Sequence, residues 1–278
     1  MENIDKETIN FFINQLFEVY KSYDKIVQGI KYGYFLYDVK LESISFNDAG
    51  KRENIENSLE DLKENIAGLK NKYNRTNIKI DSGALNKKES YLNLVSSIRE
   101  CRKCELSLKR INIVVGNGPI ETSVMIIGEA PGEQEDIQGL PFVGKAGQLL
   151  TKIMESSGLD REKFYITNCV KCRPPNNRVP AQNEIISCFE FLKQQIQLIK
   201  PSLIISLGAT STSFLLQKKV FMNQIHGKII ESSALLKQKL LIYPVFHPSF
   251  LLRDNTKIPE AQKDFVNIGA YIRKNNLI

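Results

Sequence analysis

Five cysteines are the first residues whose type and spacing suggest chemistry. Cys101 and Cys104 form a C-x2-C pair, and Cys172 and Cys188 lie sixteen positions apart much further along the chain. A structural zinc site usually presents two tight pairs, so the wide second spacing favours four thiolates on an iron-sulfur cluster over zinc. Cys169 competes with Cys172 on spacing alone, although its place at the end of an apolar run favours a buried, inert thiol.

Polar or flexible residues follow four short apolar runs. The runs and the residues after them are 124–127 with Gly128 and Glu129, 164–167 with Asn168, 203–207 with Gly208, and 240–246 with His247. Ligands of open α/β sheets bind outside the carboxyl ends of the strands, so we expect these residues to meet at one crevice. A carboxylate, an amide, a bare backbone and an imidazole at one crevice are typical of an enzyme.

The elements that must position these residues alternate along the chain. Helical patterns occupy the gaps between the runs or follow the last one, at 146–156, 182–199, 209–216 and 260–273. The alternation predicts an α/β fold, with three α/β/α layers around a central four-stranded, mainly parallel sheet. We assign this fold to a domain at 91–278.

Residues 1–90 form a different region, for which we predict a helical N-terminal extension and a linker. Apolar residues recur at steps of three or four within 5–30 and 55–73, which predicts two amphipathic helices. Between 71 and 90 the composition shifts to Asn, Lys, Ser and Gly, which is typical of a linker. No motif in this region indicates chemistry, so its function stays unknown.

The composition limits the class of protein. The chain has 278 residues, of which 42% are apolar, and no run of about 18 apolar residues, so we expect no membrane association. The N-terminus lacks the basic-then-apolar order of a secretory signal, which favours a cytoplasmic protein without disulfides. The formal charge is +7, and residues 1–90 are nearly neutral, so the basic surplus lies in 91–278. That surplus suits a polyanion such as DNA, with plain solubility charge as the alternative.

Four longer motifs together resemble a known family. They are GEAPGEQED at 128–136, GLPFVGKAGQLL at 139–150, TNCVKCRPPNNRVP at 167–180 and HPSFLLR at 247–253. They are similar to the motifs of the family 4 uracil-DNA glycosylases, iron-sulfur enzymes of the uracil-DNA glycosylase superfamily. The resemblance covers roughly residues 95–275 and leaves the first 90 or so residues unmatched.

The resemblance implies an activity and a cofactor. It implies hydrolysis of the N-glycosidic bond of deoxyuridine in single- or double-stranded DNA, which releases uracil and leaves an abasic site for base excision repair. It also implies a structural [4Fe-4S] cluster on Cys101, Cys104, Cys172 and Cys188, with Cys169 as a bystander.

The resemblance further assigns roles within the uracil pocket, whose expected residues are Gly128, Glu129, Glu135, Phe142, Asn168 and His247. Phe142 would stack on the base, and Asn168 would accept from uracil N3–H and donate to O4. His247 would donate to O2 as the bond breaks, and it is favoured over the only other histidine, His226. Glu135 would crowd uracil C5 and exclude the methyl group of thymine.

The group that activates water stays open. Classical uracil-DNA glycosylases have an Asp where this chain has Ala130, so Glu129 is expected to position the water or to stabilise the cationic sugar. We count Glu129, Asn168 and His247 as the catalytic residues.

Contacts with DNA are expected from the last motif. Phe250, Leu251, Leu252 and Arg253 would form a wedge that enters the minor groove, and Lys145 and Arg253 would contact phosphates.

Other functions stay open at this point. A broader glycosylase acting on other altered bases is one alternative, and a catalytically silent DNA-binding or replication-associated module of the same fold is another. We expect a monomer. Whether the N-terminal helices bind a protein partner, such as a polymerase clamp, is not decided by the sequence.

Overall fold

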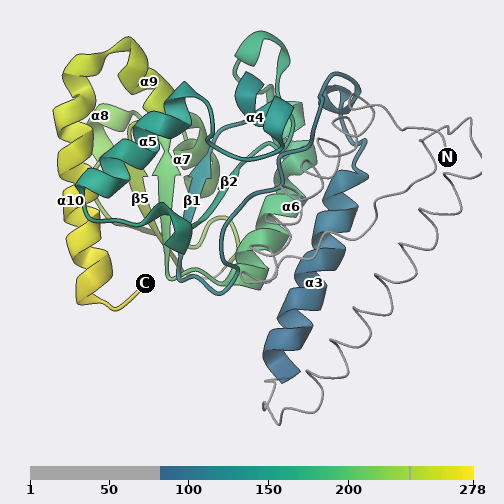
Figure 1. Ribbon diagram of the computed structural model, residues 1–278, viewed down its shortest axis with the longest axis horizontal. Coiled ribbons are helices and arrows are strands. Elements are labelled where there is room, and N and C mark those ends of the chain that lie inside the picture. The colour runs from purple at the N-terminus through teal and green to yellow at the C-terminus, as the bar shows by residue number, and fades with distance from the viewer. Residues whose placement is uncertain (1–81, 238) are drawn as a thin grey trace, which may run out of the picture. The chain divides into compact units, whose positions relative to one another are not determined.

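The computed structural model describes residues 82–237 and 239–278 (Figure 1). The chain divides into two units, Met1–Leu85 and Asn86–Ile278, a few residues before the boundary predicted at 90 and 91. The helices predicted at 5–30 and 55–73 lie outside the described residues. Helix α3 spans Ser82–Arg99, so the last part of the predicted linker is helical instead. Within the described residues, no helix is long and apolar enough to cross a membrane.

A five-stranded sheet forms the centre of the second unit, with the strand order β2-β1-β3-β5-β4. The strands are β1 Val124–Gly128, β2 Tyr165–Asn168, β3 Leu203–Leu207, β4 Ile230–Ser232 and β5 Leu240–Val245. The first three neighbouring pairs are parallel, and β4 runs antiparallel to β5 at the edge. The predicted α/β fold and its four parallel strands are therefore confirmed. The prediction of only four strands missed β4, which has three residues and no buried one.

Helices cover both faces of the sheet. Their bounds are α4 Glu133–Gln138, α5 Lys145–Ser156, α6 Gln182–Ile199, α7 Gly208–Leu216, α8 Met222–Ile225, α9 Pro248–Arg253 and α10 Ile258–Lys274. The four helices predicted from periodicity correspond to α5, α6, α7 and α10. Helices α4, α8 and α9 were not predicted, because they have at most six residues each and are too short for a periodic pattern.

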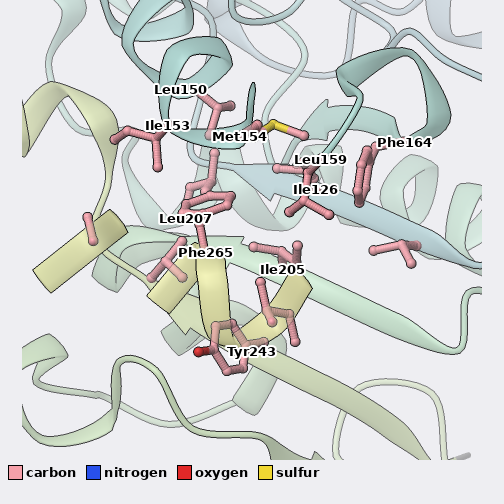
Figure 2. Close-up of a cluster of buried hydrophobic side chains, with 14 of the residues drawn as sticks. Ile126, Leu150, Ile153, Met154, Leu159, Phe164, Ile205, Leu207, Tyr243 and Phe265 are labelled. Atoms are coloured by element: carbon pink, nitrogen blue, oxygen red, sulfur yellow. The ribbon is translucent and has the colours of Figure 1, made fainter. Parts of the chain in front are cut away.

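The main core lies between one face of the sheet and helices α5 and α10 (Figure 2). Ile126 and Ile205 of the sheet meet Leu150 and Met154 of α5 and Phe265 of α10 there, all at most 2% exposed. Each such side chain contributes roughly 1.5–3 kcal/mol to folding through its burial.

The opposite face is covered by α3, α6 and α7. The amide of Gln195 in α6 donates to the Tyr165 hydroxyl of β2 at 2.9 Å, and the Tyr91 hydroxyl of α3 lies 2.9 Å from the same oxygen. Phe189 of α6 packs edge-on against Phe214 of α7. Coverage of both faces explains why β1 and β3 are buried at every residue rather than at alternate ones.

Candidate active site

The carboxyl ends of the parallel strands open into a pocket of about 510 Å³. Glu129 follows β1, Asn168 ends β2 and His247 follows β5, and all three line this pocket together with Phe142. The register places Gly128 directly beside Asn168. The structure thus brings together the polar residues that the sequence placed at one crevice, whereas Gly208 lines a second, adjoining pocket instead.

Asn168 presents an amide oxygen that lacks a partner. Its side chain is 1% exposed, and its Oδ1 forms no hydrogen bond within the described residues. A Cβ atom at Gly128 would collide with this oxygen and would lie 2.5 Å from Phe142 Cζ. The glycine therefore leaves the space in which the amide and the aromatic ring approach the pocket.

His247 presents a ring nitrogen that also lacks a partner. The backbone N–H of Ser249 donates to His247 Nδ1 at 3.1 Å, and the Ser249 hydroxyl lies 2.7 Å from it. Burial, together with the smaller effect of the positive charge of Arg253, lowers the pKa of His247 to about 4. The ring is therefore neutral at pH 7 and, because Nδ1 accepts, its proton sits on Nε2. This Nε2 is buried without a partner in the described part of the chain.

Phe142 is held in a strained backbone conformation beside His247. Its φ is 54°, a left-handed value that costs a residue other than glycine about 1–3 kcal/mol. The ring centroids of Phe142 and His247 are 5.9 Å apart. A Cβ atom at Gly147 would collide with the Phe142 carbonyl group, so this glycine permits the close approach of α5 to the Phe142 backbone.

Two charged side chains, the buried Glu135 and the partly buried Arg161, hold the segment around Phe142. The Glu135 carboxylate accepts from the backbone N–H groups of Val143 and Gly144, both at 2.8 Å, and from Gly132 at 3.1 Å. The Arg161 guanidinium donates to the carbonyl of Pro141 at 2.8 Å. Through these bonds the Glu135 carboxylate restrains the loop. Glu135 also lines the pocket, and its predicted role in excluding the methyl group of thymine stays a prediction.

Glu129 differs from Glu135 in that its carboxylate is not engaged. It lines both pockets, and its side chain forms no hydrogen bond or ion pair with the other described residues. Its backbone carbonyl accepts from Val170 N–H at 3.0 Å, which fixes the main chain at the end of β1. The carboxylate is thus available to a ligand at either pocket.

Lys171 connects Asn168 to the layer behind the sheet. Its ammonium group is fully buried and donates to Thr167 Oγ1 at 2.6 Å, Gln195 Oε1 at 2.6 Å and the backbone carbonyl of Asn168 at 2.7 Å. Burial lowers the pKa of Lys171 to about 8. Sequence reasoning missed both the buried Lys171 and the partly buried Arg161, because no spacing pattern distinguishes such a cation from one on the surface.

The four predicted ligand cysteines contribute to one apolar cluster. Cys172 and Cys188 are buried in it, and Cys101 and Cys104 pack against it. Arg110 Nη1 donates to Cys172 Sγ at 3.1 Å, and the Lys171 backbone N–H donates to Cys188 Sγ at 3.3 Å. Within residues 82–237 and 239–278, however, no group of three or more His, Cys, Asp or Glu is arranged to hold a metal ion.

Cys169 is distinct from these four cysteines. It is fully buried, it is not among the described members of the apolar cluster, and burial raises the pKa of its thiol to about 12. A thiol with so high a pKa is unreactive.

The predicted DNA wedge is only partly exposed. Leu252 is 50% exposed and Arg253 is exposed, whereas the Phe250 ring packs 5.4 Å from that of Phe246. Leu251 is 1% exposed and belongs to the main core, so its assignment to the wedge is wrong. On the short helix α9, Leu251 faces inward while Leu252 and Arg253 face solvent.

His226 belongs to another cluster. Its Nδ1 lies 2.7 Å from Asp264 Oδ2, its ring packs 4.4 Å from that of Phe246, and it lines neither pocket. Lys145, in contrast, lines the first pocket.

The parallel sheet with its pocket at the strand ends agrees with the sequence comparisons. Residues 115–271 match the uracil DNA glycosylase superfamily, and the chain belongs to that superfamily. Within it, the chain is similar to type-4 uracil-DNA glycosylases, which confirms the resemblance to family 4. It is 45% identical to that of Thermotoga maritima, over 61% of this chain and 87% of the relative. It is 43% identical to that of Saccharolobus solfataricus, over 62% and 82%, and 38% identical to that of Archaeoglobus fulgidus, over 67% and 95%.

Proposed function

We propose that residues 86–278 form a uracil-DNA glycosylase that hydrolyses the N-glycosidic bond of deoxyuridine in DNA for base excision repair. The observation that carries this proposal is the pair of unpartnered buried atoms, Asn168 Oδ1 and His247 Nε2, at one pocket. An unsatisfied buried polar atom costs about 1–3 kcal/mol, so their presence favours a ligand that supplies the missing partners. Uracil offers N3–H to the amide oxygen and O2 to the imidazole N–H.

Base selection would come from Asn168 and Phe142. Uracil inside a duplex is out of reach, so the nucleotide must turn into the pocket, where the Phe142 ring stacks on the base. Asn168 then accepts from N3–H and donates to O4. Cytosine has an acceptor at N3 and a donor at C4, which would leave both amide groups unpaired and thereby select for uracil.

His247 would act on the leaving group. As the bond between C1′ and N1 breaks, its electron pair moves onto uracil, and negative charge collects at O2 beside the Nε2–H donor. A hydrogen-bond donor that stabilises negative charge developing only as the bond breaks lowers the activation barrier of that step. One such donor typically increases the rate about 10²–10³-fold. Water adds its oxygen to C1′ and releases a proton, which neutralises the departed uracil anion. The free carboxylate of Glu129 is our candidate to orient that water or to stabilise the cationic sugar.

DNA would lie across the exposed part of the predicted wedge. Leu252 and Phe250 are candidates to fill the space left by the turned nucleotide, and Lys145 and Arg253 are candidates for phosphate contacts. We expect the protein to act as a monomer on either single- or double-stranded DNA.

The test is uracil release from a single-stranded uracil oligonucleotide, followed by alkaline cleavage at the abasic site. We expect cleavage with the wild type and a loss of about 10²–10³ in rate with His247→Asn. Absence of an abasic product with the wild type would contradict the enzyme and favour a silent DNA-binding module.

We further propose that Cys101, Cys104, Cys172 and Cys188 hold a [4Fe-4S] cluster with a structural role. Support comes from the donor set, four thiols at one apolar cluster, and from two N–H donors directed at their sulfur atoms. Such hydrogen bonds are common at iron-sulfur sites. We expect a yellow-brown protein with absorbance near 400 nm that is lost in Cys172→Ser and kept in Cys169→Ser. A colourless protein with stoichiometric zinc would contradict the cluster.

A further inference from the structure

A second pocket of about 520 Å³ adjoins the one described above. Five residues line both pockets, namely Glu129, Asn177, His247, Ser249 and Arg253. The rest of the second pocket is largely apolar, and its aromatic side chains are Phe221, Phe246 and Phe250. A ligand that fills the first pocket and extends past His247 and Arg253 therefore reaches an aromatic surface next.

Phe221 is the most exposed aromatic side chain of this pocket. It is 60% exposed, yet its backbone is fixed where helix α8 begins. The preceding Val220 is buried, and its N–H donates to Ser213 Oγ at 3.2 Å. Val179, which is 62% exposed, lines the same pocket. Two large apolar side chains that face solvent at one pocket indicate a binding surface.

Positively charged side chains lie near this aromatic surface, which also has the carboxylate of Glu129 at the end shared with the first pocket. Lys218 and Lys219 precede Phe221 in the sequence and are exposed, and Lys219 Nζ lies 5.7 Å from the centroid of the Phe221 ring. Arg253, also exposed, lines the pocket from α9. Aromatic rings flanked by cations are the usual means by which proteins bind unpaired nucleic-acid strands, because the rings stack on bases and the cations attract phosphates.

We propose that Phe221 stacks on the base of the nucleotide adjacent to uracil in an unpaired DNA strand. This inference rests on the proposed function, which places uracil in the first pocket. A base held in a duplex is already stacked and paired, so the contact favours uracil in single-stranded DNA over uracil in a duplex.

The test combines two variants at Phe221 with a change in the DNA. Phe221→Ala and Phe221→Trp are compared with the wild type on a short single strand with one uracil, and on two strands that carry a baseless residue on its 5′ or its 3′ side. Steady-state uracil release gives kcat and KM, and fluorescence anisotropy gives Kd. Ile186→Ala is the matched control, because Ile186 is 63% exposed on α6 and lines neither pocket.

We expect Phe221→Ala to raise KM and Kd about tenfold on the intact single strand, with kcat unchanged. Phe221→Trp, which keeps an aromatic ring, should have the KM and Kd of the wild type. Removal of the base on one side of uracil should raise KM and Kd of the wild type by the same factor, and should not raise those of Phe221→Ala any further. The inference is overturned if Phe221→Ala behaves like Ile186→Ala, or if its defect persists unchanged on both baseless strands. Uracil release absent from the wild type, with Phe221-dependent binding retained, would contradict the proposed activity and leave the stacking site supported.

Discussion

Asn168 and His247 line one pocket from the ends of two strands. Each is held by hydrogen bonds to atoms other than the one that it presents to the pocket, Oδ1 in Asn168 and Nε2 in His247. The backbone carbonyl of Asn168 accepts from the Lys171 ammonium, and His247 Nδ1 accepts from the Ser249 N–H. These contacts fix the main chain at Asn168 and the imidazole ring of His247, with its Nε2–H, before any ligand arrives. Preorganisation of this kind is what electrostatic stabilisation of a departing base requires.

Asn168→Asp tests the specificity role. A carboxylate at this position cannot donate to uracil O4 as the amide does, whereas its protonated form can donate to cytosine N3. We expect slower uracil release and a smaller ratio of uracil to cytosine release, measured on matched oligonucleotides. Asn183→Asp, on the exposed start of α6, is the control. An unchanged ratio in Asn168→Asp would remove Asn168 from base selection.

The protonation state of His247 gives a second test. Its pKa in the folded protein is about 4, below the ordinary value of 6.5, so the folded state resists a proton that the unfolded chain binds. The stability associated with the neutral ring is therefore complete above about pH 6.5 and decreases as the pH falls toward 4. We expect one of the two histidine ring signals in NMR not to shift between pH 5 and 8, and His247→Asn to remove that signal. A titration near pH 6.5 that disappears in His247→Asn would contradict the neutral donor.

At the scale of elements, the site depends on links between segments that follow different strands. Lys171 connects the end of β2 to α6 through Gln195, and Glu135 connects α4 to the loop before α5. The strained φ of Phe142 is maintained by such links rather than by its own preference. The geometry of the pocket is therefore a property of the packed helices as well as of the residues that line it.

Lys171→Met tests the first of these links. Methionine fills similar space but leaves three buried acceptors without their donor, so we expect a loss of at least about 1–3 kcal/mol, the cost of one such acceptor, in the free energy of unfolding. Because Asn168 loses a restraint, kcat/KM for uracil release should also fall, by roughly tenfold. Urea unfolding and the release assay measure the two effects, and absorbance near 400 nm shows whether any cluster is retained. Lys152→Met, exposed on α5, is the control, and equal behaviour of the two variants would contradict the role of Lys171.

Much of this arrangement could be predicted from the sequence, for physical reasons. The parallel strands are buried on both faces, so they read as continuous apolar runs, and the residues after them fall at one edge. Edge strand β4 has no such run, since its residues are partly or fully exposed. The inward orientation of Leu251 and the burial of Lys171 depend on tertiary packing, which the local spacing of residues does not reveal.

At the scale of the whole molecule, the cysteine region joins segments that are distant in the sequence. Cys101 and Cys104 follow α3, Cys172 follows β2 and Cys188 lies in α6. Lys171, next to Cys172, joins α6 to the backbone of Asn168, so the position of these segments bears on the pocket although no cysteine lines it. Their shared apolar cluster is small compared with the main core.

Removal of the proposed cluster tests whether this region needs the metal. A cofactor bound only by the folded state stabilises that state, and 1 kcal/mol corresponds to about 2–4 °C in Tm for a domain of this size. We expect iron removal by a chelator to lower Tm by at least about 5 °C and to slow uracil release, because the segments that carry the four cysteines are then held together only by the small apolar cluster and their hydrogen bonds. Cys169→Ser should match the wild type before and after chelation, since Cys169 lies outside the proposed ligand set. An iron-free protein with the wild-type Tm would show that packing alone suffices, and the cluster would then have no structural role.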